Sequence, residues 1–545
     1  MTGAAVGCTP RLAVQPRERR SGALGLRVWP IHRRTGREGR IVEADAPSCA
    51  GVPEPLPRAR ASTPLPVQRA DVLSRASHDR KCRGSLYDGR MSDLHAAVEA
   101  VLPGVRADLE RLVRIPSVAF EGFDHSHVAA SAEAVAELLR GAGMPDVRIV
   151  TGVGPTGKPG QPAVIGRKPA PPGAPTVLLY AHHDVQPAGD PANWEQDDPF
   201  EPVERDGRLF GRGCADDKAG IMAHVAALRA FGDDLPVGVT VFVEGEEEYG
   251  SDSLENIIAE HRDLLASDVI VIADSGNWDI GHPALTTSLR GLVNVYVEVK
   301  TLKQAVHSGM FGGPVPDALT ALCRLLATLH DENGDVAIDG LVRGTAAPLD
   351  MPTERLRAEA GMLDGVEFIG TGRIVERIWT KPTATVLGVD APGAREAANA
   401  LQPSARAKVS VRLAPGDDDV SAFAAVKAHL EKNVPWGAQV SVTLDQGGNP
   451  CVIDARGPAY DAARAAFAEA WDGTEPVDMG VGGSIPFIAT FQELFPNAAI
   501  LVTGVEDPDA RAHGPNESLH LEEFARVCHA EALLLQKVAQ LKPSA

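Results

Sequence analysis

Three consecutive carboxylates, Glu246, Glu247 and Glu248, follow closely after an apolar run at residues 239–243. Packing like charges together costs free energy unless a cation or a raised pKa offsets the repulsion. A divalent metal ion would be such a cation, with carboxylate oxygens as its ligands. The first chemistry that these residues indicate is therefore metal binding.

Four further polar clusters could supply ligands to such a metal. They contain His182 with Asp184, Asp216 with Asp217, Asp274, and His513. His182 and Asp184 are two residues apart, so the imidazole can bind a metal while the carboxylate holds its other ring nitrogen. Each cluster also has an ordinary interpretation, as a polar loop, a helix cap, a solvated turn or a surface histidine. Together, two histidines with several carboxylates and no cysteine match the nitrogen and oxygen ligands of two adjacent zinc, manganese or cobalt ions.

The elements that must position these clusters are short apolar strands. In residues 91–288, helical patterns alternate with β-branched runs, which predicts an α/β catalytic domain with a mostly parallel sheet flanked by helices. The polar clusters follow the runs at 176–180, 239–243 and 269–272. Ligands of open α/β sheets collect at the edge where strands end, so the clusters are expected to meet there.

A second, inserted domain is predicted at residues 289–448. Its pattern is strand, helix, two strands, helix, strand, which is typical of a two-layer α/β lid or dimerisation domain. The chain is expected to return to the catalytic domain at 449–545. Residues 1–90 are rich in Arg and Pro without sustained periodicity, which predicts a disordered extension. We expect Met91 to be the true initiator, with an Arg-rich targeting arm as the alternative.

Composition excludes several classes of function. The net charge of −20 and the aromatic content of 5% argue against nucleic acid as a partner. No stretch of about 20 apolar residues and no secretory signal pattern is present in the sequence, so no membrane partner and a cytoplasmic location are expected. The seven cysteines are scattered without a CxxC pair, so neither a disulfide framework nor a thiolate zinc site is indicated.

Six segments resemble signature segments of the M20 metallopeptidase family, carnosinase-like dipeptidase branch, in the family's order. They read AHHDVQP, GRGCADDKAG, VEGEEEYGS, AVHSGMFGG, GGSIPF and AHGPNE. The resemblance implies two divalent metal ions per subunit, with zinc expected and manganese or cobalt as alternatives. It implies that His182 and Asp274 hold one ion, that Glu248 and His513 hold the other, and that Asp216 bridges both. It also implies that Asp184 orients His182 and that the peptide between Asp216 and Asp217 is cis.

The resemblance further implies a mechanism for hydrolysing the peptide bond of dipeptides. Glu247 would be the general base that takes a proton from a water shared by the two ions. His307, in AVHSGMFGG, would stabilise the oxyanion and would reach the active site of a partner subunit in a homodimer formed through the lid. From its sequence context alone, His307 could equally be a turn residue.

The expected substrate is a small peptide with a free C-terminal carboxylate. Ser484 and Gly483 of GGSIPF, with Arg412 or Arg406, could bind that carboxylate. These arginines could instead face solvent, and Gly483 could be only a turn. The chain departs from the animal carnosinase type at Gly480–Val481 and at Thr385–Gly388, so we expect a general dipeptidase. The alternatives are an N-acyl-amino-acid amidohydrolase of the same fold and, from another class, a non-catalytic metal-binding structural protein.

Overall fold

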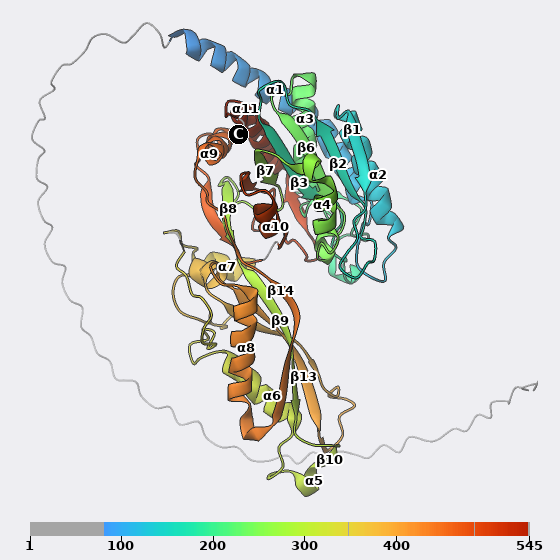
Figure 1. Ribbon diagram of the computed structural model, residues 1–545, viewed down its shortest axis with the longest axis vertical. Helices are drawn as coiled ribbons and strands as arrows, with labels where there is room; N and C mark the ends of the chain where they lie inside the picture. The colour runs from blue at the N-terminus through green and yellow to red at the C-terminus, as the bar shows by residue number, and fades with distance from the viewer. Residues whose placement is uncertain (1–80, 347, 484–485, 543–545) are drawn as a thin grey trace, which may run out of the picture. The chain divides into compact units, whose positions relative to one another are not determined.

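The computed structural model describes residues 81–346, 348–483 and 486–542 (Figure 1). Its helices are α1 (Lys81–Val113), α2 (Ser126–Gly141), α3 (Lys218–Phe231), α4 (Leu254–Leu265), α5 (Ser308–Phe311), α6 (Ala318–Leu326), α7 (Thr353–Glu359), α8 (Asp419–Asn433), α9 (Pro458–Ala470), α10 (Pro486–Leu494) and α11 (Leu521–Val538). Its strands in the first half of the chain are β1 (Asp146–Val150), β2 (Ala163–Lys168), β3 (Thr176–His182), β4 (Val203–Arg205), β5 (Arg208–Phe210), β6 (Gly238–Glu244) and β7 (Val269–Ile272). The remaining strands are β8 (Ala284–Leu289), β9 (Gly291–Lys300), β10 (Val306–His307), β11 (Thr383–Asp390), β12 (Ala400–Leu401), β13 (Ser404–Leu413), β14 (Gln439–Gly448), β15 (Cys451–Val452), β16 (Val477–Val481), β17 (Ala499–Val502) and β18 (Ser518–His520).

The larger sheet has nine strands, in the order β1-β2-β6-β3-β7-β17-β8-β15 with β16 also paired to β8. Its central strands β6, β3, β7 and β17 are parallel, while the pairs β1·β2, β2·β6, β17·β8 and β8·β15 are antiparallel. The carboxyl ends of the four central strands therefore meet at one edge, as the sequence predicts for an α/β fold of this class.

The core of this layer follows from the composition of its strands. Strands β6 and β7 are buried along their whole length, and β3 is buried except at Thr176. Continuous Val, Ile and Leu runs suit strands that are covered on both faces. Helices α1 and α11 pack against α3, which packs against β3, and α2 packs against β1 and β2. This packing holds the central strands, and hence the loops at their ends, in place.

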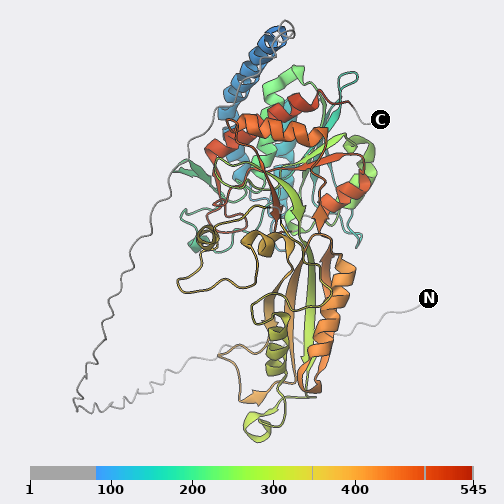
Figure 2. The ribbon, with the colours of Figure 1, turned by 90° about the vertical axis from the view of Figure 1, so that its left-hand side faces the viewer.

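The second sheet has four antiparallel strands, in the order β11-β13-β9-β14 (Figure 2). Alternate residues of β9, namely Val293, Val295, Val297 and Val299, are buried in one cluster with residues of α6 and α8. The main elements β9, α6, β11, β13, α8 and β14 follow the predicted order, with the short elements β10, α5, α7 and β12 added between them, and the two-layer α/β arrangement is confirmed. Strand β9 continues from β8, and after β14 the chain returns through β15 to pair with β8 again.

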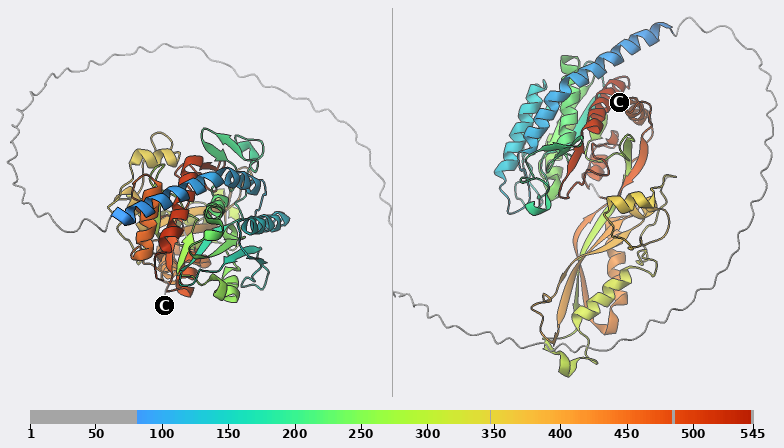
Figure 3. Two further views of the ribbon diagram at one scale, coloured as in Figure 1. Left: turned by 90° about the horizontal axis from the view of Figure 1, so that it is seen from above. Right: turned by 180° about the vertical axis from the view of Figure 1, so that it is seen from behind.

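The predicted extension falls mainly on residues that the structure does not describe. Helix α1 begins at Lys81, upstream of Met91, and runs on to Val113 (Figure 3). The expected disorder, the targeting arm and the start at Met91 all remain predictions. No helix in the described ranges is long and apolar enough to cross a bilayer. Cys214, Cys323, Cys451 and Cys528 are free.

A buried ion pair joins α3 to α11 and leads to a prediction about stability. His224 Nδ1 lies 2.7 Å from Glu531 Oε1, and His224 Nε2 lies 3.0 Å from the Tyr180 carbonyl oxygen. Burial opposes charge on His224, but the Glu531 carboxylate outweighs it and raises the pKa of His224. We expect Glu531→Gln to lower the free energy of unfolding by on the order of 3 kcal/mol near pH 6, as measured by urea denaturation.

The pH dependence of this loss follows from the sign of the pKa shift. A raised folded-state pKa contributes stability that is fully present below the unfolded pKa and is lost as pH rises through the folded pKa. The difference between Glu531→Gln and the wild type should therefore shrink at alkaline pH. Glu522→Gln, an exposed change on the same helix, is the control. An equal loss of free energy of unfolding near pH 6 and at alkaline pH would contradict an ion pair at this position.

Candidate metal centre

The predicted ligands come from different elements that end at one edge of the larger sheet. His182 is the last residue of β3, Glu248 follows β6, and Asp274 follows β7. Asp216 lies in the loop before α3, and His513 lies in the loop between β17 and β18. Since β3, β6, β7 and β17 are parallel, their carboxyl ends bring these side chains together, although they are spread from 182 to 513 in the chain.

The five side chains form two groups that share Asp216. One group contains His182, Asp216 and Asp274, the other contains Asp216, Glu248 and His513, and each group has its possible ligand atoms within 4.8 Å of one another. Asp216 Oδ1 lies 3.0 Å from His182 Nε2, and Asp216 Oδ2 lies 3.1 Å from His513 Nε2. The two oxygens of one carboxylate thus face one group each, which is the geometry a bridging ligand needs.

The other members of each group lie at similar distances. Asp274 Oδ1 is 3.9 Å from His182 Nε2, and Glu248 Oε2 is 3.2 Å from His513 Nε2. The peptide bond between Asp216 and Asp217 is cis, as the resemblance implies. His513 has a φ of 61°, in the left-handed region that residues other than glycine rarely adopt.

Asp184 contacts His182, as expected, and also contacts the loop that carries the acidic cluster. Its carbonyl oxygen, rather than its carboxylate, is the closer contact of His182 Nδ1, at 3.1 Å against 3.5 Å. Its carboxylate accepts hydrogen bonds from the backbone N–H groups of Glu247 and Glu248, both at 3.1 Å. The residue therefore holds the loop that carries the acidic cluster as well as the first histidine.

Asp184→Asn tests this loop contact. A carboxylate can accept both N–H bonds, whereas an Asn side chain has one acceptor oxygen and would turn its NH₂ toward the second N–H. We expect turnover and metal affinity each to fall by about ten- to a hundredfold with little loss of stability. Turnover by the zinc-loaded enzyme and metal titration of the stripped protein check this. Unchanged metal affinity would show that the loop does not need the contact.

Two supporting residues were not assigned from the sequence. Glu517, in the AHGPNE segment, accepts hydrogen bonds from the N–H groups of Gly213, Ala215 and Asp216 at 2.9–3.1 Å. Gln186, in the AHHDVQP segment, donates to Glu248 Oε2 at 2.7 Å through its side chain. Both residues lie inside segments that the resemblance identified, so their polar character was the available signal. Their roles depend on contacts between distant parts of the chain, and a single sequence does not contain those.

The electrostatics of the two groups favour positive charge. Burial and then the carboxylate of Asp274 raise the pKa of Glu247 well above its usual range. Burial and like charges also raise the pKa of Asp274 to about 7. The carboxylates of Asp216 and Glu248 raise the pKa of His513 to about 11. Repulsion among the acids and attraction of a proton to His513 both indicate that a cation belongs at this point.

The residues present fit two divalent ions. Each group combines one imidazole nitrogen with carboxylate oxygens, which suits zinc, manganese or cobalt. The shared carboxylate of Asp216 places the two groups side by side. Glu247 belongs to neither group and directly precedes Glu248 in the chain, so its carboxylate is not among the candidate ligands.

The predicted substrate-binding residues do not all meet at this centre. Arg406 is half exposed and forms an ion pair with Asp390 at 2.6 Å. In the sheet, Arg406 is opposite Glu298 of β9. Arg412 is opposite Leu292, at the other end of β9, and lies near Arg290. The Nε of Arg290 donates a hydrogen bond to the Gly482 carbonyl oxygen at 3.0 Å. Arg412 and Gly483 are therefore neighbours of the same buried arginine, whereas Arg406 is about 20 Å further along the strand. Ser484 lies outside the described residues.

His307 is also distant from the two groups of its own chain. It ends β10, is exposed, and accepts a hydrogen bond from the Gly309 N–H at 3.1 Å. The ten residues of β9 carry the chain about 30 Å from β8 before β10 begins. His307 therefore lies at the end of the second sheet that is far from β8.

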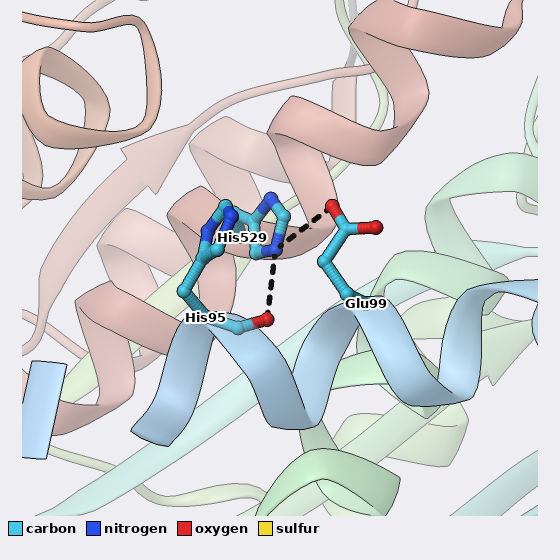
Figure 4. Close-up of side chains that lie close together, drawn as sticks. All are labelled: His95, Glu99 and His529. Atoms are coloured by element: carbon cyan, nitrogen blue, oxygen red, sulfur yellow. Dashed lines mark hydrogen bonds and ion pairs between the residues drawn. The ribbon is translucent and has the colours of Figure 1, made fainter. Parts of the chain in front are cut away.

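A third group of possible ligands, His95, Glu99 and His529, joins α1 to α11 (Figure 4). The two imidazole rings stack with centroids 4.1 Å apart and 19° between their planes. His529 Nε2 lies 3.3 Å from the His95 carbonyl oxygen and 3.7 Å from Glu99 Oε1. Lone pairs of an imidazole lie in the ring plane, so stacked rings direct them side by side and not at a shared ion. We interpret this group as a packing contact between the two helices.

The fold and the two ligand groups at the sheet edge define the class of metal-dependent hydrolases. Residues 178–537, more than half of the chain, match the family model described as peptidase family M20/M25/M40. The chain belongs to this family and is a metallopeptidase.

Named relatives are dipeptidases. The cysteinylglycine-S-conjugate dipeptidase of Corynebacterium striatum is 38% identical over 382 residues, which cover 68% of this chain and 83% of the relative. The human Beta-Ala-His dipeptidase is 30% identical, with 70% and 78% covered. The structure of the di-peptidase Dug1p from Saccharomyces cerevisiae superposes with a TM-score of 0.72 at 26% identity, covering 83% of this chain and 99% of that one.

Proposed function

We propose that this chain hydrolyses the peptide bond of dipeptides, using two divalent metal ions held by His182, Asp274, Asp216, Glu248 and His513. The observation that carries the proposal is the pair of ligand groups joined by the two oxygens of Asp216. The Cys-Gly and Beta-Ala-His dipeptidases among the relatives support a dipeptide substrate. Bound at these groups, two ions would supply an activated water and a Lewis acid for the scissile carbonyl.

Glu247 is the general base in this proposal. Burial raises its pKa, which brings its proton affinity closer to that of a group that both takes and returns a proton near neutral pH. Its backbone N–H is held by Asp184, so the carboxylate has a defined position beside Glu248. Glu247 removes the proton of the attacking water and then delivers it to the amine that leaves.

The C-terminal carboxylate of the substrate binds at the Gly482–Gly483 segment. Arg290 fixes this segment through the Gly482 carbonyl, and Arg412 brings a second guanidinium to the same place. Arg412 is the candidate for a bidentate pair with the substrate carboxylate, together with Ser484. Arg406 is left out because it is already paired with Asp390 at a distance from the segment.

Zinc is the proposed native metal, and a homodimer in the cytoplasm is the proposed state of the protein. The mixed nitrogen and oxygen donors support zinc without excluding manganese or cobalt. The dimer is supported by the position of His307, which is exposed at the far end of β9 from β8 and could act only on a partner's substrate. In that role His307 would donate a hydrogen bond to the oxyanion.

A substrate panel tests the function. Metal-stripped enzyme is refilled separately with zinc, manganese and cobalt, and is assayed with Cys-Gly, alanyl-alanine, Beta-Ala-His and matched N-acyl amino acids. Metal-dependent cleavage of the free dipeptides is the expected result. Turnover confined to N-acyl amino acids would assign the chain to the amidohydrolases of this fold. No turnover of any compound with any metal would favour a metal-binding protein without catalysis.

A further inference from the structure

Glu506, which has no role in the proposed mechanism, lies at the same sheet edge as the metal centre. It follows β17, and it forms a parallel bridge with Gly276, two residues after Asp274. The Asn277 N–H donates to the Glu506 carbonyl oxygen at 2.8 Å. The pairing of β7 with β17, in which Ile272 is opposite Val502, thus continues in register past the strand ends.

The direction of the Glu506 side chain follows from this pairing. A Cβ atom placed on Gly276 would lie 3.3 Å from the Glu506 Cβ, so both positions project to the same face. Gly276 is two residues after Asp274, with a bend at Ser275 between them, and the Asp274 carboxylate is close enough to act on the charge of Glu506. Gly504 allows this close approach, because a Cβ there would lie 1.4 Å from the Ser275 carbonyl oxygen. Glu506 therefore projects beside Asp274.

The Glu506 carboxylate has no partner among the described residues. None of their side chains or N–H groups donates to it, and the side chain is partly exposed. Burial, and then the carboxylates of Asp216 and Asp274, raise the pKa of Glu506 well above its usual range. The acid is thus placed where negative charge is already dense, and the basic group that acts on it, His513, is itself a predicted metal ligand.

Two divalent ions would not offset the charge of Glu506. They would bring four positive charges, and the carboxylates of Asp216, Glu247, Glu248 and Asp274, when ionised, would bring four negative ones, with the histidines neutral as ligands. Of the nearby acids outside this balance, Glu517 is paired with Arg212 at 2.6 Å, Asp184 accepts two N–H bonds, and Asp217 accepts the His182 N–H at 3.2 Å. Glu506 is therefore a further acid at this sheet edge, beyond the carboxylates that would bind the ions.

We propose that Glu506 binds the free α-ammonium group of the substrate and so selects dipeptides over N-acyl amino acids. This inference rests on the proposed function and deepens it. An ammonium group has three donors and a full positive charge, and it lies on the residue whose carbonyl is attacked. A carboxylate beside the metal ligand Asp274 can therefore reach it while the carbonyl stays at the ions. An N-acyl amino acid brings no such charge and leaves Glu506 unpaired.

Alanyl-alanine and propionyl-alanine give the sharpest test, because they differ only in the ammonium group. We expect the wild-type zinc enzyme to favour alanyl-alanine in kcat/KM. Glu506→Gln keeps the shape of the side chain and removes its charge, so kcat/KM for alanyl-alanine should fall by about ten- to a hundredfold, mainly through KM. Hydrolysis of propionyl-alanine should be unchanged or faster. Asp509→Asn removes an exposed charge from the same loop and should leave kcat/KM for both substrates unchanged.

The outcomes separate the two proposals. If the wild type cleaves alanyl-alanine and propionyl-alanine equally well, the role of Glu506 is overturned while the hydrolytic function stands. An equal fall for both substrates in Glu506→Gln would also overturn it, since that is the result of a disturbed metal centre. Metal content and thermal melts of the variant distinguish such a disturbance from misfolding. If the wild type cleaves neither compound with any metal, both proposals fail.

Discussion

Glu247→Gln is expected to reduce kcat by about a thousandfold while the protein keeps its fold and its two metal ions. Glu247 lies beside the ligand groups but belongs to neither, so its loss removes proton transfer and leaves the ligands in place. Gln has nearly the same shape, and the backbone bond to Asp184 is unaffected. Turnover of alanyl-alanine, together with metal content by mass spectrometry of the native protein, measures both parts of this expectation.

The same substitution at Glu248, the next residue of the loop, should give a different result. Glu248→Gln replaces a predicted ligand, so it should lose metal as well as turnover, because Glu248 lies 3.2 Å from His513. Glu255→Gln, an exposed change at the start of α4, should leave both unchanged. A Glu247→Gln enzyme with more than about a tenth of wild-type kcat would remove Glu247 from the role of general base.

Asp216→Asn is expected to weaken binding of both metal ions by more than about a hundredfold and to abolish turnover. The reason is geometric, because one oxygen of Asp216 faces His182 and the other faces His513. Asn offers a single acceptor oxygen and no charge, so it cannot serve two ions. Metal titration of the stripped protein should show two ions bound with high affinity in the wild type and none in the variant.

A second ligand variant separates a shared ligand from an ordinary one. Asp274 belongs to one group only, so Asp274→Asn should weaken one ion and retain the other. Asp234→Asn, an exposed change after α3, controls for the loss of charge. If Asp216→Asn retained one tight ion, the carboxylate would not be a bridge, and the assignment of the two groups would have to be redrawn.

Elements whose structure depends on a local sequence pattern could be predicted. Apolar β-branched runs at β3, β6 and β7 predict buried parallel strands, and a polar cluster after such a run predicts a ligand at the sheet edge. His182, the glutamates after β6, and Asp274 could be placed by that rule alone. His513 could not, because its loop follows no comparable pattern, and only the resemblance to a family pointed to it.

The predictions fell short where a side chain's partner lies far away in the chain. The Asp184 carboxylate lies 3.5 Å from His182 Nδ1, as expected, but it also accepts the N–H groups of Glu247 and Glu248, which the sequence did not indicate. Arg406 and Arg412 lie on one strand and look alike in sequence, but β13 places one beside Asp390 and the other beside Arg290. Strand direction and register decided which arginine could meet a substrate.

By itself, the sequence determined the class of fold, the segments that carry the metal ligands, and the acid that could act as base. Local apolar periodicity and side-chain chemistry indicate the fold class and the polar clusters, and the resemblance to a family adds His513 as a ligand and Glu247 as the base. Tertiary structure alone decided that the two oxygens of Asp216 face different groups, that Glu517 holds the loop of Asp216, and that Glu506 projects beside Asp274. Each of these depends on the register between strands or loops that are distant in the chain, and register is set by packing of the whole core.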